Sequence, residues 1–565
     1  MRKSPALIAM VSLMTLAATA APAPKKVAVT RTVLAARMPA AGSASLKLVD
    51  PERIRAHVKF LSDDLLEGRG TGQRGGEIAA HYIATEYALQ HLQPAGDNGT
   101  YFQKVPMVGL TTLPESKFTI VPANGQPIEL NFKKDITAYD ETEQKASDVD
   151  ADVVFVGYGI EAPEFNWDDY KGMDVKGKIL LMLVNEPPSD DAKFFNGRAL
   201  TYYGRWTYKF EEAARKGAVG VLIVHKTDMA SYGWNVVETS NTGEKDYLRG
   251  TTTPKLKLES WIQLGVAEQI AKSAGKSVDE LIQMANSRDF KPMPLPVRMK
   301  ADLVSNVRPF DSYNVIGKVE GSDPQLKNQA ILYSAHWDHL GIRKDQPGDN
   351  IYNGAVDNGT GVGVLLEIAR AFAENPIKPR RSIYFAAVTG EEQGLRGSEF
   401  LGQHPPVPDK GVSLALNFDG LAPIGVPEEI SVTGAERNTF YPTLEQTAKE
   451  FKLNIVPDSN PSAGYYYRSD HFSFSRVGIP AFSINQGNKF EGKPKEYGEN
   501  YEKAYVKNNY HQPSDEFHND WDFAGNARIA RFGVALGWKA ANMQQEVQWH
   551  AGDEFEAARK ASAGK

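Results

Sequence analysis

Short apolar runs alternate with amphipathic segments after about Val304, and this alternation restricts the possible folds more than any other feature. Runs at 330–335, 383–388, 412–418 and 479–484 have the length and continuous hydrophobicity of strands buried on both faces. The clearest helical segment between them, 361–375, places Val362, Leu365, Leu366, Ala369 and Phe372 on one face. The pattern predicts an α/β fold, a doubly wound and mostly parallel sheet.

Polar side chains follow these predicted strands at the point where each strand ends. In an open parallel sheet, ligands bind beyond the carboxyl ends of the strands. The same edge should receive a Gly-rich loop before the helix at 361–375 and a downstream Asn-Tyr-His segment. The candidate residues are His336, Asp338, Asp357, Glu391, Glu392, Asp419, Tyr510 and His511.

Each candidate also has an ordinary structural interpretation when it is taken alone. A single histidine is more often structural than a ligand, Asp357-Asn358-Gly359 could be a turn with a helix cap, and Glu391-Glu392 could be a solvated loop. These separate interpretations become less convincing when all the candidates are predicted at one edge of the sheet. Adjacent acidic groups repel one another, and a cation is the simplest reason to gather them there. We therefore predict a metal site.

The composition narrows the chemistry of that site. The chain of 565 residues has no cysteine, which excludes disulfides and thiolate nucleophiles and leaves His, Asp and Glu as metal ligands. Imidazole and carboxylate ligands without thiolate fit a catalytic zinc site, and the inventory suits two zinc ions bridged by one carboxylate. The net charge is −6 with no basic stripe, so we expect no nucleic-acid partner.

The first twenty residues have the pattern of an export signal. Arg2 and Lys3 precede a short apolar stretch, and Ala18-Thr19-Ala20 fits a cleavage site. The apolar stretch is too short to span a membrane. We expect a signal peptide at 1–20, a flexible lead-in at 21–44, no stable membrane anchor, and a periplasmic or secreted product.

The chemistry-bearing residues match a known family in their order. The His-x-Asp, Asp-Asn-Gly, Gly-Glu-Glu, Asn-x-Asp and Tyr-His elements resemble those of the co-catalytic di-zinc exopeptidases, which include bacterial leucine-type aminopeptidases and glutamate carboxypeptidase. The segments 57–72 and 94–102 resemble the start of that family's catalytic domain. The resemblance implies that His336 and Asp419 hold one zinc ion, Glu392 and His511 hold the other, and Asp357 bridges them.

The resemblance also implies catalytic roles for three further residues. Glu391 would be the general base that takes a proton from the attacking water and passes it to the leaving amine. Tyr510 would donate a hydrogen bond to the developing oxyanion, and Asp338 would orient His336. The expected function is that of an exported di-zinc metallo-aminopeptidase acting on peptide substrates.

The middle of the chain resembles an inserted protease-associated domain, expected to be β-rich. Gly157-Tyr158-Gly159 and the segments 174–179 and 211–218 carry this likeness. The expected organisation is a catalytic domain at 45–140 and 301–545, the insertion at 141–300 and a C-terminal tail at 546–565. A Pro-rich stretch at 291–297 is expected to be a linker or a domain boundary. Arg205, Trp206 and Tyr208 in the insertion are either packing residues or substrate contacts, and packing is the more common role of such side chains.

Three alternatives share these motifs. A carboxypeptidase would need a basic pocket for the terminal carboxylate, and no clear basic cluster lies beside the motifs. A glutaminyl cyclase uses similar ligands around one zinc ion, and the number of ligands and the insertion argue against it. A non-catalytic binding protein on the same scaffold would have lost ligands, and all five are present.

Overall fold

The computed structural model describes residues 36–343, 346–407, 411–458 and 461–563, so the expected signal peptide lies outside the described residues. Part of the expected flexible lead-in is helical, because α1 (Ala40–Leu48) already begins at Ala40. Ser45 in α1 is buried and its hydroxyl accepts a hydrogen bond from Trp538 of α14 (Ala524–Asn542). Tertiary contact with α14 therefore orders a segment whose own sequence has no clear helical period.

The predicted parallel sheet is present. Its strands lie in the order β21 (Ala481–Ser483), β18 (Val412–Asn417), β14 (Ala330–His336) and β17 (Ser382–Val388), and these four are parallel to one another. Each of the four predicted apolar runs overlaps one of these strands. The register sets His336 beside Val388, so the chain segments that follow the strands emerge along one edge.

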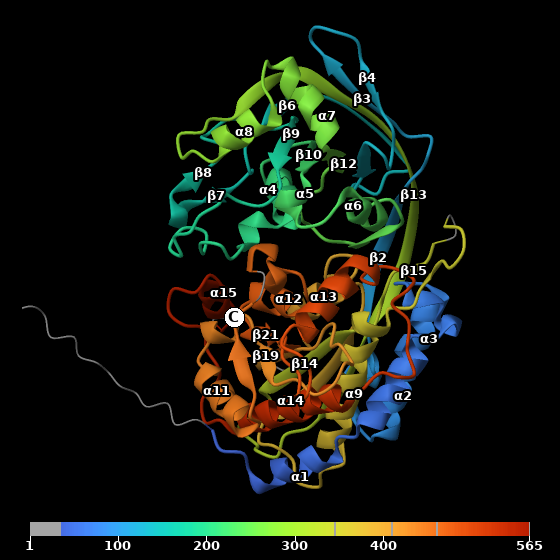
Figure 1. Ribbon diagram of the computed structural model, residues 1–565, viewed down its shortest axis with the longest axis vertical. Helices are drawn as coiled ribbons and strands as arrows, with labels where there is room; N and C mark the ends of the chain where they lie inside the picture. Colours follow the sequence, from blue (N-terminus) through green and yellow to red (C-terminus); the bar gives the residue numbers. More distant parts are fainter. Residues whose placement is uncertain (1–35, 344–345, 408–410, 459–460, 564–565) are drawn as a thin grey trace, which may run out of the picture. The chain divides into compact units, whose positions relative to one another are not determined.

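Helices cover both faces of this sheet, as the doubly wound prediction requires (Figure 1). On one face, α9 (Gly361–Ala373) packs with α14 and with α2 (Pro51–Leu61), and all five predicted core residues of α9 are buried. On the other face, Leu401 of α10 (Arg396–Gln403) and Phe474 of α12 (His471–Arg476) pack against Leu332 of β14. Successive residues of β14 thus serve two separate cores.

The linker alternative for residues 291–297 is wrong, because these residues begin a long strand. Strand β13 (Met293–Val319) continues from one sheet into the next and runs along the molecule in Figure 1. The alternate residues Leu295, Val297 and Met299 are buried, which is the period-two pattern of a strand. Pro294 and Pro296 are tolerated because the pairing with β6 (Ala146–Phe155) shifts register between Pro294 and Arg298.

We call residues 36–112 and 305–563 the main region and residues 113–304 the inserted region. The sheet of the inserted region includes β3 (Lys117–Pro122), which pairs with β13. This sheet therefore begins before the expected boundary at 140/141. From β13 onward, neighbouring strands of this sheet follow the order β13, β6, β9, β10, β12 and β5. These strands and their helices are β3 (Lys117–Pro122), β4 (Ile128–Leu130), β5 (Ile136–Tyr139), β9 (Ile179–Leu183), β10 (Gly220–His225), β12 (Leu258–Gln263), α4 (Trp206–Arg215), α5 (Thr227–Ala230), α6 (Trp234–Ser240), α7 (Leu264–Ser273) and α8 (Val278–Ala285).

The main region holds further elements around the parallel sheet. Strand β2 (Phe102–Thr112) pairs with β13 and also with β11 (Lys245–Leu248), a strand of the inserted region. This pairing extends the sheet toward the inserted region. The elements are α3 (Arg74–Leu89), α11 (Tyr441–Glu450), α13 (Tyr497–Asn508), α15 (Glu556–Ala563), β1 (Gln93–Pro94), β2 (Phe102–Thr112), β15 (Gly341–Ile342), β16 (Ile351–Tyr352), β19 (Glu429–Ser431), β20 (Asn454–Val456) and β22 (Asn485–Gln486). Among the described residues, none of the helices combines the length and the hydrophobicity needed to cross a membrane.

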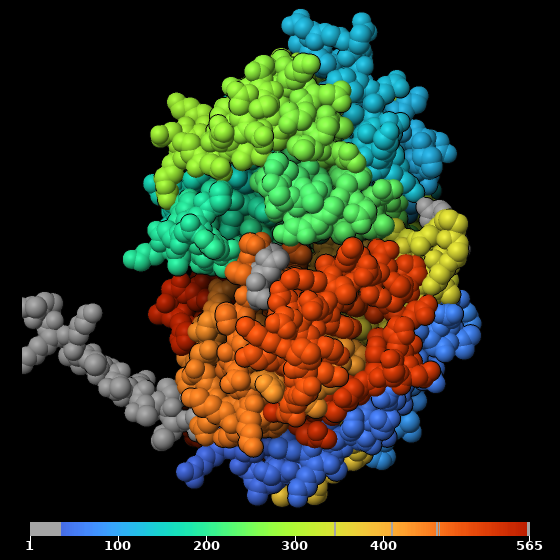
Figure 2. Space-filling model, viewed as in Figure 1, coloured from blue at the N-terminus to red at the C-terminus, as the bar shows by residue number. Residues whose placement is uncertain are grey.

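The two regions contact each other beyond the strands they share. The backbone amide of Leu200 in the inserted region donates to the carbonyl of Pro461, over 3.1 Å. The ring of Tyr202 packs on that of Phe472 with a centroid distance of 4.9 Å. In Figure 2 the green surface of the inserted region meets the orange surface of the main region along this boundary. The insertion is therefore packed against the elements that follow the parallel strands.

Candidate metal centre

The predicted ligands come from separate segments at the carboxyl edge of the parallel sheet. His336 is the last residue of β14, Glu392 follows β17, and Asp419 follows β18. Asp357 lies in a short π-helical turn, Ala355–Thr360, directly before α9. His511 lies in the loop after α13. The strand register and the start of α9 together bring residues far apart in the sequence to one place.

The five predicted ligands contact one another around Asp357. One carboxylate oxygen of Asp357 lies 3.3 Å from His336 Nε2, and the other lies 3.4 Å from His511 Nε2. His336 Nε2 is also 3.3 Å from Asp419 Oδ1, and His511 Nε2 is 3.1 Å from Glu392 Oε2. The cluster thus has two halves, each with one imidazole and one further carboxylate, and Asp357 faces both.

This donor set fits zinc. Imidazole nitrogen and carboxylate oxygen are zinc ligands, and three protein ligands in each half leave room for water or substrate. Ligand atoms of His336, Glu391 and Asp419, and those of His339, Asp357 and Glu392, each lie within 4.8 Å of one another. The convergence of six such groups in a buried site is costly without a cation. The residues present therefore suit a metal centre.

His339 belongs to this cluster although the sequence analysis did not single it out. Its Nδ1 atom lies 2.5 Å from Glu392 Oε1, and its side chain is buried. Glu392 is thereby held between His339 and His511. The available signal was the His-x-x-His spacing of His336 and His339 directly after a strand.

Asp338 has a different set of contacts from the one we expected. The Nδ1 atom of His336 lies 3.1 Å from the backbone carbonyl oxygen of Asp338, whereas the Asp338 carboxylate is 3.9 Å away. That carboxylate instead accepts hydrogen bonds from the Glu391 amide (3.2 Å) and from the Thr71 hydroxyl (3.0 Å). Burial raises the pKa of Asp338. The residue thus positions both His336, through its carbonyl, and the backbone of Glu391.

Glu391 and Tyr510 border the cluster without bonding to its centre. Glu391 Oε2 is 3.9 Å from His336 Nε2, and burial raises the pKa of Glu391 well above its ordinary value. The ring of Tyr510 stacks on that of His511 at a centroid distance of 3.9 Å, and 40% of the residue is exposed. Both side chains are available to a bound molecule.

Asp515 supports the Asp357 loop. Its carboxylate oxygens accept hydrogen bonds from the amides of Val356 and Asp357, each over 3.1 Å, and from the Tyr505 hydroxyl. Asp515 does not orient His511, because the Nδ1 atom of His511 has no hydrogen-bond partner within the described residues. Asp515 therefore fixes the residue that faces both halves of the cluster.

Arg69 joins the loops that carry His336 and Asp357. The guanidinium is buried and donates to the carbonyl oxygens of Trp337 and Gly354, both over 2.8 Å. It also donates to the carbonyls of Leu61 and Asn353. Burial lowers the pKa of Arg69 to about 10, so the group stays charged at neutral pH. A single side chain thus satisfies four buried carbonyl groups around the site.

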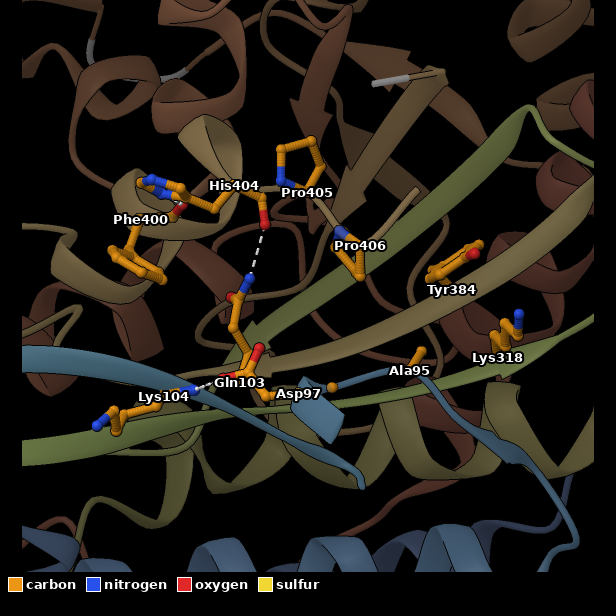
Figure 3. A pocket seen from close by; sticks show the side chains of 11 residues that line it. Ala95, Asp97, Gln103, Lys104, Lys318, Tyr384, Phe400, His404, Pro405 and Pro406 are labelled. Atoms are coloured by element: carbon orange, nitrogen blue, oxygen red, sulfur yellow. Dashed lines mark hydrogen bonds between the residues drawn. The ribbon is translucent and has the colours of Figure 1, made fainter. Parts of the chain in front are cut away.

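A separate cavity of about 540 Å³ lies elsewhere in the main region. Its lining includes Gln103, Lys104, Lys318, Tyr384 and His404, and Figure 3 shows the Gln103 amide donating to the His404 carbonyl. None of the predicted ligands lines this cavity. Its position along β2, β13 and the start of β17 separates it from the carboxyl edge of the sheet.

Comparison with known proteins agrees with this geometry. Residues 314–533 match the model of peptidase family M28. An aminopeptidase of Pseudomonas aeruginosa (strain UCBPP-PA14) is 24% identical over 461 residues, which cover 79% of this chain and 73% of that protein. The leupeptin-inactivating enzyme 1 of Streptomyces exfoliatus is 31% identical over 179 residues, covering 31% of this chain and only 36% of that protein.

The fold is also that of a solved structure. The aminopeptidase from Aneurinibacillus sp. strain AM-1 superposes with a TM-score of 0.52 at 19% identity, over 91% of this chain and 98% of that one. The matched segment 314–533 contains the parallel strands and all five predicted ligands. The segment 314–533 therefore carries the match to peptidase family M28, the co-catalytic zinc exopeptidases, and the chain around it has the fold of a solved aminopeptidase.

Proposed function

We propose that this protein is an exported aminopeptidase that removes N-terminal residues from peptides with two zinc ions. The observation that carries the proposal is the Asp357 carboxylate, whose two oxygens each face a different histidine. One zinc ion would be held by His336, Asp419 and Asp357, and the other by His511, Glu392 and Asp357. Such a pair, when bound, would lower the pKa of a water ligand and polarise the scissile carbonyl.

The protein's own residues supply the proton transfers. Glu391 lies at the edge of the cluster, within reach of a water molecule placed between its carboxylate and the substrate carbonyl. Its carboxylate would take the proton of the attacking water and deliver it to the leaving amine. The backbone bond from the Glu391 amide to Asp338 keeps this carboxylate beside the centre. Tyr510, stacked on His511 and half open, would donate a hydrogen bond to the developing oxyanion.

Export and the nature of the insertion complete the proposal. The charged and apolar segments of residues 1–20, ending in Ala18-Thr19-Ala20, support removal of a signal peptide during export. The inserted region would be a protease-associated domain that borders the substrate site. Its contacts at Leu200 and Tyr202 with the main region support that position.

The first test compares the Glu391→Gln variant with the wild-type enzyme. The amide is isosteric but cannot accept the proton, so kcat should fall about 10²- to 10⁴-fold on an aminoacyl p-nitroanilide. Zinc measured by plasma mass spectrometry should stay at about two ions per chain, since Glu391 is not a proposed ligand. Near-normal turnover in this variant would refute Glu391 as the base.

The second test uses the wild-type enzyme on a substrate panel, with and without a chelator. An aminopeptidase should cleave free-amine peptides, fail on N-acetylated peptides and lose activity with the chelator. Cleavage of N-acetylated peptides alone would instead identify a carboxypeptidase, and release of cyclised N-terminal glutamine would identify a glutaminyl cyclase. A chain that binds zinc but cleaves nothing would be a binding protein.

A further inference from the structure

Two arginine side chains from different regions come together next to the candidate metal centre. Arg205 precedes α4 in the inserted region, and Arg468 follows the short 3-10 helix Tyr465–Tyr467 in the main region. The Nε atoms of both are buried without a hydrogen-bond partner in the part of the chain that the structure describes. Within those residues neither guanidinium forms an ion pair either. The sequence shows no basic cluster here because the two arginines come from separate regions.

The chain connectivity ties Arg468 to the metal centre. The next residue, Ser469, donates its hydroxyl to Asp419 Oδ2 over 2.5 Å and accepts a hydrogen bond from the Asn417 amide over 2.8 Å. Asp419 is a proposed zinc ligand. The Arg468 backbone is therefore anchored one residue away from a side chain that contacts the centre. Arg468 also interacts electrostatically with Tyr510, whose ring stacks on that of the proposed ligand His511.

Arg205 reaches the same place from the inserted region. Its charge interacts with Arg468 and with Tyr510, and burial together with Arg468 lowers the pKa of the Arg205 guanidinium to about 10. At neutral pH the group remains protonated. The packing of Tyr202 on Phe472 and the bond from Leu200 to Pro461 hold this segment of the insertion against the loop that leads to Arg468.

Aromatic rings surround the pair. The guanidinium of Arg468 lies 6.0 Å from the ring of Tyr232 and 5.5 Å from that of Tyr465, and that of Arg205 lies 6.0 Å from Trp206. Ring faces stabilise a cation moderately, but they do not satisfy guanidinium N–H groups. Two like charges with unused donors in a partly buried place favour an anion with planar, bidentate oxygens.

We propose that Arg205 and Arg468 together bind a carboxylate of the peptide substrate. This inference rests on the proposed function, since it assumes that the substrate lies across the cluster beside Tyr510. The carboxylate has two possible sources, the side chain of an acidic N-terminal residue or the free C-terminus of a very short peptide. Either source would make the inserted region part of the specificity site.

The experiment measures carboxylate preference in two arms. The first arm compares kcat/KM for Glu-p-nitroanilide with that for Gln-p-nitroanilide, and the second compares Ala-Ala with Ala-Ala-amide. Loss of one charge-assisted contact corresponds to roughly 10- to 100-fold. In one of the two arms we expect the wild-type enzyme to have a higher kcat/KM, by about this factor, for the substrate that carries the carboxylate. The arm that shows this preference identifies whether the carboxylate comes from the N-terminal side chain or from the C-terminus.

The variants then test the two residues. Arg205→Met and Arg468→Met should each remove most of the preference in that arm, and Arg205→Lys and Arg468→Lys should retain part of it. Arg298→Met is the matched control, because Arg298 is an exposed arginine of the inserted region that pairs with Asp150 and Asp152. Its preference should equal that of the wild type. Far-UV and near-UV circular dichroism verify that each variant is folded.

The outcomes separate this inference from the proposed function. An enzyme that cleaves neutral aminoacyl substrates with chelator sensitivity, but shows no carboxylate preference in either arm, overturns the arginine site alone. The arginine site is also overturned if folded Arg205 and Arg468 variants keep the full preference. If only peptides with a free C-terminus are cleaved, whether or not the amine is acetylated, the aminopeptidase assignment fails and the carboxylate site stands.

Discussion

The metal centre and the arginine pair are built in different ways. Every proposed zinc ligand belongs to the main region and follows a strand of one sheet, precedes α9 or follows α13. The arginine pair requires both regions, since Arg205 comes from the insertion and Arg468 from the main region. A site at the end of parallel strands is set by sheet register, whereas a site at a boundary is set by how two regions pack. We therefore expect the geometry of the metal centre to tolerate changes in how the two regions pack, whereas the geometry of the arginine pair should change with that packing.

The largest expected effect comes from Asp357, the residue that faces both halves of the metal centre. Asp357→Asn removes the charge of the carboxylate and would weaken the proposed bridging of two cations, so activity should fall by roughly 10³-fold or more. Zinc content should fall below two ions per chain in the same preparation. Asp323→Asn is the control, because Asp323 pairs with Arg380 at a distance from the cluster.

This variant tests whether the main region alone builds the centre. The carboxylate preference defined by Arg205 and Arg468 cannot be measured without turnover, but equilibrium binding of the preferred peptide should persist in the variant. An Asp357→Asn enzyme with two zinc ions and near-normal activity would contradict the bridging role.

Arg69→Met is expected to have the next largest effect, on stability. The substitution leaves four buried carbonyl groups without their donor, which should lower the free energy of unfolding by about 3–5 kcal/mol. Urea denaturation followed by tryptophan fluorescence measures this change. Arg298→Met should change the same quantity by less than about 1 kcal/mol, because its ion pairs are exposed.

Arg69→Lys sharpens this prediction. A lysine carries the charge but has one donor centre, so it cannot reach carbonyls on separate loops at once. It should recover only a minor part of the lost stability. Full recovery by lysine would mean that charge alone, rather than the distribution of donors, holds the loops of the metal centre together.

Much of the main region could be predicted from its sequence because its signals are local. Strands β14 and β17 are nearly continuous apolar runs; His336 ends the first, and Glu391 lies shortly after the second. The two-fold alternation in 295–303 was equally present, but the prolines at 292, 294 and 296 suggested a linker. The shift in strand register that accommodates Pro294 depends on the pairing with β6, which no local pattern reveals.

The less predictable features depend on tertiary contact. Arg69 lies in a Gly-rich segment that gave no sign of its four carbonyl partners. Asp338 contacts Glu391 rather than His336 with its carboxylate, which depends on the path of the loop after β17. The sequence alone leaves Arg205 as either a packing residue or a substrate contact, because only the fold brings the inserted region beside Arg468.

The smallest expected effect concerns an ion pair across the boundary between the two regions. Glu211 of α4 and Arg476 of α12 lie 3.2 Å apart, and their side chains are 31% and 39% exposed. Exposed pairs of this kind contribute less than about 1 kcal/mol, because solvent screens the attraction and ordering two long side chains costs entropy. A double-mutant cycle with Glu211→Gln and Arg476→Gln, measured by urea denaturation, should therefore give a coupling energy below that limit. If the coupling is several kcal/mol instead, the boundary is held by electrostatics rather than by the packing of Tyr202 on Phe472. The arginine pair would then sit at a rigid interface, and its carboxylate preference should decline with rising salt concentration in step with that coupling.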